Sequence, residues 1–498
     1  MTTLSTLHIH ESSQTIPVSF FAIGPELVLL ICALVLIAGA IFLPERAARL
    51  FSALVAAGAL VGAEVVAAVQ FNRSPHFSFD HTIRVDAFGA SAQLIIFAAA
   101  LLAVLVSWGG AKEVGDRSVE FYALLLTATA GMALLTVANS FVIVFVALEL
   151  FSLALYILVA IELDALSSLE ASLKYLVVGS VGAAFLLYGS AFIYGATGQL
   201  EFDRIRAVLS AGGHHNPVLL IGVAMVIVGL GFKSNAAPFH MWTPDAYEGA
   251  PTTVTAFMAA ATKTTALIVT LRVLVTAFPA IDGIWQDAIG AIAIVSFAVG
   301  NLAALRQTNV KRMLAYSTVG HTGFLLTAVA AHSVLGTEAL LYYLVMYAAM
   351  NVGAFAVVAV REREIGRPVQ ISDFRGYGYS RPWLGAAMLI FLLSLAGFPP
   401  TGGFIGKLTI FSAAVASGQT YLAIAGIVAT MVALVYYLRI PAAMYDREAP
   451  APTAVSSVGE MLSSTAALVG AGFVLAFGIV PGPIFDLART ATTSLLGG

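Results

Sequence analysis

Charged residues are scarce in this sequence of 498 residues. Asp, Glu, Lys and Arg make up 10% of the chain and hydrophobic residues 60%, and the mean hydropathy is +0.94. A soluble globular domain carries roughly a quarter charged residues. The low share of charge excludes a soluble protein and predicts an all-α, polytopic membrane protein. The formal net charge is −3 and no basic tract is present, so nothing indicates a nucleic-acid partner.

Cysteine is almost absent as well. The single cysteine, Cys32, lies in a hydrophobic run. One cysteine excludes an intramolecular disulfide, a cysteine-ligated iron–sulfur cluster and a cysteine zinc site. No carboxylate cluster has the ligand count that calcium or magnesium requires, so no metal site is expected. Residues 1–14 contain no Lys or Arg; because a signal peptide needs a basic region, we expect the first span to be retained.

Long apolar runs dominate the chain instead. About fourteen runs have the length of roughly 20 residues that crosses a bilayer. They lie at about 20–43, 50–71, 86–108, 119–137, 140–161, 171–195, 217–242, 252–278, 285–305, 313–331, 336–360, 384–415, 419–445 and 459–480. Small residues within these runs offer close helix contacts: Gly58, Gly62, Gly179 and Gly182.

The loop charges predict an orientation. Most loop Lys and Arg residues follow odd-numbered spans, among them Arg361, Arg363, Arg367, Arg375 and Arg381. Positively charged loops collect on the cytoplasmic side, so both termini are expected on the opposite, periplasmic side. Arg272 lies near the outer end of the eighth span, where we expect its long side chain to snorkel to the headgroups.

Two spans are interrupted in the same way. The seventh contains Lys233 followed by a proline, and the twelfth contains prolines followed by Lys407; the break residues are Pro238, His240, Pro399 and Pro400. Bare polar backbone at membrane depth is tolerated only against protein or a watery cavity. Paired interrupted spans indicate an ion pathway and an inverted repeat.

The two interrupted spans, the seventh and the twelfth, are offset by five, which divides the chain into units of five spans. Spans 4–8 and 9–13 then form two five-helix units, and an odd number of helices makes the second unit enter from the opposite face. The predicted division is three leading helices (1–112), a first unit (113–280), a second, inverted unit (281–447) and a last helix (448–498).

Ionisable side chains inside the spans are the candidate functional residues: Glu149, Lys174, Lys233, Lys263, His321 and Lys407. A charge at the bilayer centre costs roughly 2.5–3.5 kcal/mol. The most deeply placed of them would together cost on the order of 10 kcal/mol if unpaired, comparable to a whole fold's net stability. Burial weakens a lysine's hold on its proton and a nearby carboxylate strengthens it. Such groups spaced along a membrane predict a proton relay.

Each candidate also has a purely structural explanation. Glu149 can simply partner one lysine, and Lys233 and Lys407 can cap carbonyls freed by the breaks. Lys174 follows Glu170 by four residues and can form a surface pair. Lys263 lies in a threonine-rich patch. His321 can be a satisfied core histidine, and His240 either a relay member or a loop contact.

The stretch from Phe232 to Thr252, FKSNAAPFHMWTPDAYEGAPT, resembles the signature of the antiporter-like membrane subunits of respiratory complex I, NADH:quinone oxidoreductase. Three more segments agree with the N branch of that family: Glu149–Leu153, Lys174–Gly189 and Lys311–Ser317. The resemblance covers roughly residues 115–440. The L branch adds a long C-terminal amphipathic helix and the M branch typically has a glutamate in place of Lys407, so the N branch fits best.

The resemblance implies a fold and a set of site residues. It implies fourteen helices with two inverted five-helix repeats and broken helices 7 and 12. The family's fifth-helix glutamate falls on Glu149, and its lysines of helices 6, 7, 8 and 12 fall on Lys174, Lys233, Lys263 and Lys407. A softer match places its tenth-helix polar position on His321.

The resemblance also implies a function and a setting. The chain is expected to be a non-redox subunit of a translocase enzyme in the bacterial inner membrane, moving protons through the relay. NADH, FMN, iron–sulfur clusters and quinone are expected in partners: the antiporter-like M and L subunits, the small K, J and A subunits and the peripheral arm. Because one fold serves several machines, a subunit of a sodium/proton antiporter or membrane hydrogenase stays an alternative. A scaffold whose buried charges only hold helices together is another.

Overall fold

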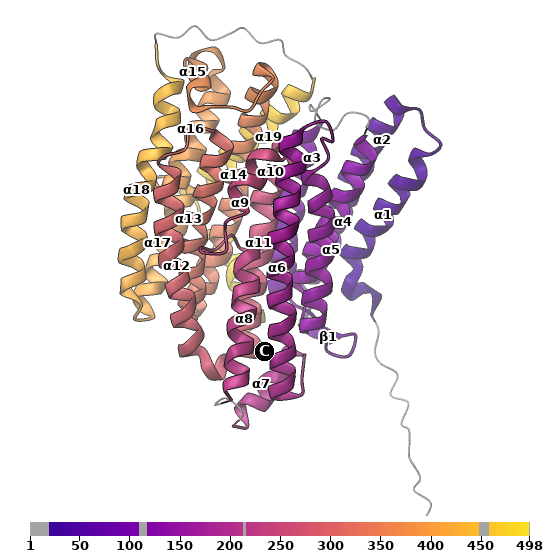
Figure 1. The fold of residues 1–498 in the computed structure, drawn as a ribbon, viewed down its shortest axis with the longest axis vertical. Helices are drawn as coiled ribbons and strands as arrows, with labels where there is room; N and C mark the ends of the chain where they lie inside the picture. Colours follow the sequence, from indigo (N-terminus) through magenta and orange to yellow (C-terminus); the bar gives the residue numbers. More distant parts are fainter. Residues whose placement is uncertain (1–18, 109–116, 213–215, 448–457, 498) are drawn as a thin grey trace, which may run out of the picture.

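The computed structural model describes residues 19–108, 117–212, 216–447 and 458–497, and almost all of them are helical (Figure 1). In chain order the elements are η1 (Phe20–Ile23), α1 (Gly24–Ala40), α2 (Glu45–Phe71), β1 (His76–Ser78), β2 (Ile83–Val85), α3 (Ala87–Ser107), α4 (Ser118–Thr136), α5 (Phe141–Val159), α6 (Leu166–Thr197), α7 (Phe202–Ser210), α8 (Pro217–Lys233), α9 (Thr243–Gly249), α10 (Thr252–Phe257), η4 (Met258–Thr262), α11 (Lys263–Ala277), η5 (Pro279–Ile281), α12 (Asp282–Ala304), α13 (Val310–Ala330), α14 (Val334–Ile365), η6 (Ile371–Phe374), α15 (Tyr377–Ser380), α16 (Pro382–Ala396), α17 (Gly402–Ala416), α18 (Thr420–Met444), α19 (Val458–Ile479) and α20 (Gly482–Leu496).

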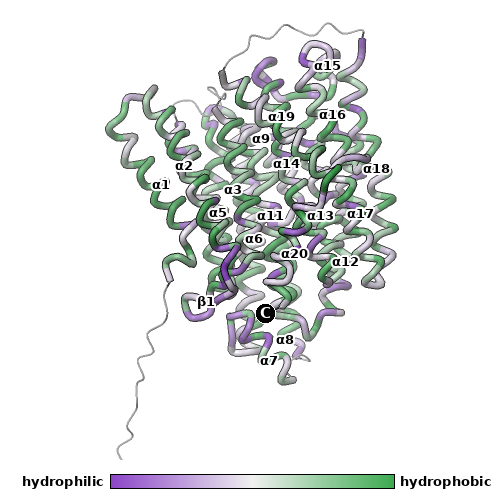
Figure 2. The backbone as a smooth tube through the Cα atoms, turned by 180° about the vertical axis from the view of Figure 1, so that it is seen from behind, coloured by the Kyte–Doolittle hydropathy of each residue, from purple (hydrophilic) through white to green (hydrophobic). Residues whose placement is uncertain are grey.

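Membrane-spanning helices make up the body of the molecule. Within the described residues, twelve helices are long and apolar enough to cross a membrane, and α8, α16 and α17 are shorter apolar helices. Figure 2 shows hydrophobic colouring along the helices and hydrophilic segments gathered mostly towards the two ends. A helix needs about 20 residues to cross the hydrocarbon core, so the three shorter helices do not cross it alone.

Two apolar helices, α8 and α16, are each followed by a short non-helical stretch. Helix α8 ends at Lys233, and the backbone is not helical again until α9 begins at Thr243. Helix α16 ends at Ala396, and α17 begins at Gly402. Between the halves of each interrupted run stand the predicted break prolines, and each stretch contains one cis X–Pro bond.

The molecule has two ends that serve as reference faces (Figure 1). The α15 face carries α15, the beginning of α13 and the ends of α14 and α18, joined by hydrogen bonds from Val310 N–H to Val369 O and from Gly376 N–H to Ala443 O. The α7 face, at the opposite end, carries α7 and the β1–β2 hairpin. Helix α13 therefore runs from the α15 face towards the α7 face, and α18 runs in the opposite sense.

The centre of the bundle is the segment α10–η4–α11, with α13 and α14 beside it. Every residue from Pro251 to Phe278 is buried. Helices that are apolar on all sides are expected inside a bundle. The π-helical segment η4 directly precedes Lys263, and π-segments are frequent at functional sites because they alter side-chain direction.

Three features differ from the sequence predictions. A two-stranded antiparallel hairpin pairs His76 with Val85 and Ser78 with Ile83, and α7 and α20 are short amphipathic helices that no apolar run predicts. Among the small residues, Gly182 packs on Phe232, as expected, whereas Gly58 has no neighbouring atom within 4 Å of where a Cβ would stand. The predicted boundary after residue 112 lies outside the described residues, as does residue 448 at the start of the last predicted segment.

The prediction that Arg272 snorkels to the headgroups is wrong. Its side chain is fully buried, and its guanidinium donates to both carboxylate oxygens of Asp86 at 2.8 and 2.6 Å. Arg84 Nε lies 3.1 Å from the same carboxylate. Asp86 caps α3, so this buried ion cluster ties the start of α3 to α11. The partner lies 186 residues away in the chain, which is why local sequence does not reveal it.

Candidate functional site

The first group of candidates surrounds the end of α8. Lys233 is 5% exposed, and its Nζ lies 5.0, 5.6 and 5.3 Å from the ring centroids of Phe151, Tyr156 and Tyr175. Aromatic faces attract a cation, so these rings stabilise a charged ammonium group. The Nζ has no hydrogen-bond partner, and neither does Glu149 Oε1 on α5. Glu149 is close enough to act electrostatically on Lys233, yet the two side chains form no direct ion pair.

The break that follows α8 is hydrogen-bonded to α12 and to the end of α8. Ala237 N–H donates to Ser296 Oγ on α12, and Trp242 Nε1 donates to Phe232 O. Pro238 lies at the surface of the chain, and His240 is half-buried with its Nδ1 unpartnered. Trp242, two residues after His240, stacks on Tyr175 of the cage around Lys233, and His240 makes no hydrogen bond to another relay candidate among the described residues.

Lys263 lies at the start of α11 and is completely buried. Its Nζ donates to the backbone carbonyl of Thr318 and, at 2.6 Å, to Thr322 Oγ1, both on α13. Thr322 Oγ1 in turn donates to Ser234 O at 2.7 Å, the residue directly after Lys233. The hydroxyls of the neighbouring threonines bond back to their own helix, so Lys263 is held by α13 rather than by the local patch.

His321 lies three residues after Thr318 and directly before Thr322 on α13, and it is 2% exposed. Its ring makes hydrogen bonds to Tyr343 on α14 and Tyr437 on α18. Neither tyrosine is among the site residues predicted from the sequence. The sequence did contain a signal for them: a tyrosine inside an apolar run carries a hydroxyl that must find a hydrogen-bond partner when it is buried.

Lys407 lies on α17 and is 3% exposed. Its Nζ donates to the carbonyls of Leu395 and Ala396 at 2.8 and 3.2 Å, so it caps the end of α16 at the second break. The same Nζ lies 4.4 Å from the ring centroid of Phe324, three residues after His321 on α13. Break residues Pro399 and Pro400 are exposed at the surface of the chain.

Helix α13 thus contacts each part of the candidate site. Its residues 318, 321, 322 and 324 contact Lys263, the tyrosine pair, the end of α8 and Lys407 in turn. Thr318 and Thr322, four residues apart, lie on one side of the helix, and His321 and Phe324 lie further round it. Lys263 and Lys407 both contact α13, which carries His321, and the bond from Thr322 to Ser234 joins α13 to the residue after Lys233. We call Lys233, Lys263, His321 and Lys407 the lysine row. Among the described residues, none of the three lysines has a carboxylate within ion-pair distance.

Lys174 differs from the other lysines. Its side chain is 46% exposed and pairs with Glu170 at 2.8 Å and with Asp245 on α9 at 2.9 Å. Arg312, at the start of α13, also binds Asp245, at 2.6 Å. Lys174 therefore belongs to an ion-pair network that joins α6, α9 and α13 towards the α15 face.

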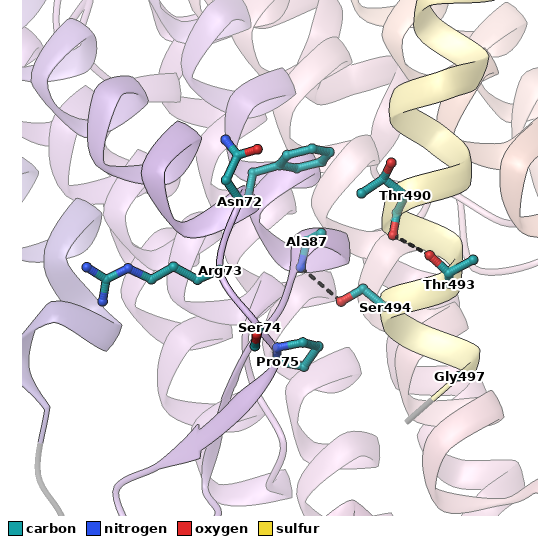
Figure 3. A pocket seen from close by; sticks show the side chains of 10 residues that line it. Asn72, Arg73, Ser74, Pro75, Ala87, Thr490, Thr493, Ser494 and Gly497 are labelled. Atoms are coloured by element: carbon teal, nitrogen blue, oxygen red, sulfur yellow. Dashed lines mark hydrogen bonds between the residues drawn. The ribbon is translucent and has the colours of Figure 1, made fainter.

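A cavity of about 520 Å³ lies away from this row, on the α7 face between the end of α2, the start of α3 and α20 (Figure 3). Its polar lining is mostly neutral: Asn72, Thr490, Thr493 and Ser494. The Arg73 side chain extends away from α20 and lies 4.1 Å over the Phe21 ring. Among the described residues, no group of three or more His, Cys, Asp or Glu side chains is arranged to hold a metal ion.

The chain resembles known proteins along nearly its whole length. A family model described as NADH:quinone oxidoreductase/Mrp antiporter, transmembrane, matches residues 138–433. The NADH-quinone oxidoreductase subunit N of Rhodospirillum rubrum is 40% identical over 95% of this chain and 96% of its own. That of Trichlorobacter lovleyi is 37% identical over 97% and 99%. A chain of respiratory complex I from Thermus thermophilus is 33% identical with a TM-score of 0.79, covering 93% of this chain and 99% of that one.

Identity of this level over nearly complete chains, together with the shared fold, confirms the resemblance inferred from the Phe232–Thr252 stretch. The chain therefore belongs to the NADH:quinone oxidoreductase/Mrp antiporter family of membrane subunits, and within it to the NADH-quinone oxidoreductase subunit N branch.

Proposed function

We propose that the chain crosses the membrane fourteen times, with two inverted five-helix units. Twelve long helices and two interrupted ones, α8–α9 and α16–α17, make up that number. The third helix of each unit supports the repeat. Helices α6 and α14 both have 32 residues, and both end at a glycine with positive φ, Gly198 and Gly366.

Hydrogen bonds at the ends of these helices support the inversion. In the first unit, Phe141 N–H at the start of α5 donates to Leu200 O just after α6. In the second, Val310 N–H at the start of α13 donates to Val369 O just after α14. The first junction lies at the α7 face and the second at the α15 face, at opposite ends of the molecule (Figure 1). The units are expected at 113–280 and 281–447, with leading helices in 1–112 and a last helix in 448–498.

The function that the site supports best is proton translocation within NADH:quinone oxidoreductase. The carrying observation is that Lys233, Lys263 and Lys407 are at most 5% exposed and yet unpaired with any described carboxylate. A lysine without a fixed counter-charge can take up and release a proton without breaking an ion pair. Buried ionisable groups at membrane depth are costly and mark ion pathways.

The relay runs along α13. A change of charge arriving from a neighbouring subunit alters the balance between Glu149 and Lys233, and Lys174 connects that end to the ion pairs towards the α15 face. The proton then passes by way of Lys263 and His321 to Lys407. Coupling of this kind needs an element with two arrangements, and the two breaks at Pro238 and Pro399 supply the candidates.

Redox chemistry belongs to the partners in this proposal. NADH, FMN, iron–sulfur clusters and quinone are held by other subunits, and this chain contacts antiporter-like and small membrane subunits of the same enzyme. Its place is the bacterial inner membrane, with the arginine-rich α15 face in the cytoplasm and both termini in the periplasm. Gentle solubilisation of a tagged chain, with an NADH:quinone assay of what co-purifies, tests this assignment.

Substitution of the lysines tests the relay itself. Lys233→Ala and Lys407→Ala membranes should pump fewer protons per NADH oxidised than wild-type membranes. Lys407→Arg is the matched variant: it keeps a positive charge, but a guanidinium does not release its proton, so pumping should fall there too. Wild-type stoichiometry in Lys233→Ala membranes would refute the relay.

Two other functions make different predictions. The matching family model also covers Mrp antiporters, and a sodium/proton antiporter subunit would give sodium-dependent exchange in vesicles without an electron donor. The bonds from Lys407 to the end of α16 suit a purely structural lysine. In that case Lys407→Ala would lower the amount of assembled enzyme while the remaining enzyme pumped normally.

A further inference from the structure

Two adjacent tyrosine pairs lie in the middle of the second unit. They are Tyr342–Tyr343 on α14 and Tyr436–Tyr437 on α18, and all four side chains are at most 1% exposed. In each pair, one hydroxyl reaches His321 and the other does not. Tyr342 donates to Phe477 O at 2.8 Å, and Tyr436 donates to Asn301 Oδ1 at 3.1 Å.

Both nitrogens of His321 are occupied by tyrosine hydroxyls. Nδ1 lies 2.7 Å from Tyr343 Oη, and Nε2 lies 2.9 Å from Tyr437 Oη. Each imidazole nitrogen either donates one hydrogen bond or accepts one. No third group can therefore exchange a proton with this ring unless a tyrosine first moves away. Lys263, the nearest relay lysine along α13, bonds to Thr318 and Thr322 instead.

The two hydroxyls approach the ring from different ends of the molecule. Tyr437 lies in the half of α18 that leads to the α15 face, and its hydroxyl also bonds to Ser317, one turn before His321 towards that face. Tyr343 lies in the half of α14 nearer the α7 face. Its ring rests on α17, because a Cβ on Gly406, the residue before Lys407, would stand 2.2 Å from Tyr343 Cδ2.

We propose that Tyr343 and Tyr437 are proton-carrying residues and form the two gates of His321. The inference rests on the proposed relay and changes one of its steps: the proton reaches His321 through Tyr437 and not directly from Lys263, whose Nζ bonds to Thr318 and Thr322. A proton enters at Nε2 from the Tyr437 hydroxyl, which takes a replacement proton from the Ser317 side. The imidazolium then releases the proton on Nδ1 to Tyr343, which passes its own hydroxyl proton on towards Lys407. Each hydroxyl gains one proton for each that it loses, so no tyrosinate remains and no oxidant or reductant is required.

Return of the ring to its starting tautomer completes a cycle. After one transfer the proton sits on Nε2 and the lone pair on Nδ1, the reverse of the starting state. The ring cannot accept a second proton from Tyr437 until that nitrogen is free again. Rotation of the ring, which breaks both bonds to the tyrosines, restores that state, whereas transfer back along the same bonds would move no net proton. The ring therefore passes one proton per rotation.

Four Tyr→Phe variants test this in the assembled enzyme. Tyr343→Phe and Tyr437→Phe remove the hydroxyls that reach His321, whereas Tyr342→Phe and Tyr436→Phe are matched controls on the same helices. NADH-driven proton uptake by inverted membrane vesicles is measured, normalised to the assembled enzyme on native gels. A positioned proton-transfer group contributes about 10²–10⁴-fold, so the first two variants should lose pumping by about 100-fold or more. The two controls should keep it.

Lys407→Ala, made in parallel, separates this inference from the proposed relay. If Tyr343→Phe and Tyr437→Phe pump normally while Lys407→Ala does not, the gates are refuted and the relay stands. If Lys407→Ala also pumps normally, the relay is refuted and the gates with it. Equal losses in the Tyr342→Phe and Tyr436→Phe controls would also overturn the gates, since packing rather than the bond to His321 would then explain them.

A second measurement tests Tyr343 in the case that Tyr343→Phe prevents assembly of the enzyme. Difluorotyrosine at position 343 keeps the ring and hydroxyl but makes the phenol more acidic. If that hydroxyl carries the proton, the pH profile of pumping shifts to lower pH relative to the same replacement at position 342. An unchanged profile would overturn the assignment for Tyr343.

Discussion

Asp86 is the residue whose replacement should most disturb the fold outside the lysine row. Its carboxylate accepts two hydrogen bonds from Arg272, lies 3.1 Å from Arg84 Nε, and accepts the N-capping bond from Gly89 N–H at 2.8 Å. Both the carboxylate and the Arg272 guanidinium are fully buried. Asp86→Asn keeps the shape and the capping oxygen but removes the negative charge.

The expected loss of stability in Asp86→Asn follows from Arg84 and Arg272, which stay positively charged without a counter-charge. Removing one partner of a buried ion pair costs about 3–5 kcal/mol, because it leaves a buried charge without compensation. The N-cap of α3 should contribute little to this loss of stability, since asparagine caps a helix about as well as aspartate does. A loss of that size is a large part of the 5–15 kcal/mol that is typical of a folded protein's net stability.

Unfolding by SDS titration of the chain in mixed micelles measures the free energy of unfolding. Asp203→Asn on the same face is the control: its carboxylate is 30% exposed and bonds to His81, and such pairs are worth about 0–1 kcal/mol. Adding Arg272→Met to Asp86→Asn should recover part of the loss, because one of the unpaired charges is then gone. If Asp86→Asn costs no more than Asp203→Asn, the ion cluster does not stabilise the fold as argued.

Two further changes test the packing and the peripheral ion pairs. Gly406→Ala places a Cβ against the Tyr343 ring and should lower the free energy of unfolding by about 1–3 kcal/mol through overpacking. Gly58→Ala is the control: its Cβ would stand in open space, so the free energy of unfolding should stay the same or rise. SDS titration measures both variants. Lys174→Met removes half-exposed ion pairs and should change the free energy of unfolding by no more than about 1 kcal/mol. A large loss of NADH-driven pumping in that variant would therefore come from a relay role of Lys174. Unchanged pumping would refute that role.

Hydropathy along the chain was sufficient to predict the membrane class and most of the helices. Proline and glycine act locally on the backbone, which is why interruptions could be predicted from the sequence. Helices α8 and α16 stop at Lys233 and Ala396, and the broken helices of a fourteen-span fold stay a prediction. The short amphipathic helices α7 and α20 were missed since they are too short and too polar for a hydropathy signal. The relay residues, the inverted units and the orientation stay predictions that the proposed experiments address.

What the sequence determined by itself were local properties: which segments are apolar, where the backbone breaks, and which charges stand inside a span. Only the tertiary structure decided which side chains meet. Arg272 finds Asp86 across 186 residues, and Tyr437 reaches His321 across 116. Such pairs depend on how each helix is rotated about its axis and packed against distant neighbours. A nearly uniform apolar helix leaves that rotation unspecified, so the partners of a buried charge emerge only when the whole bundle is assembled.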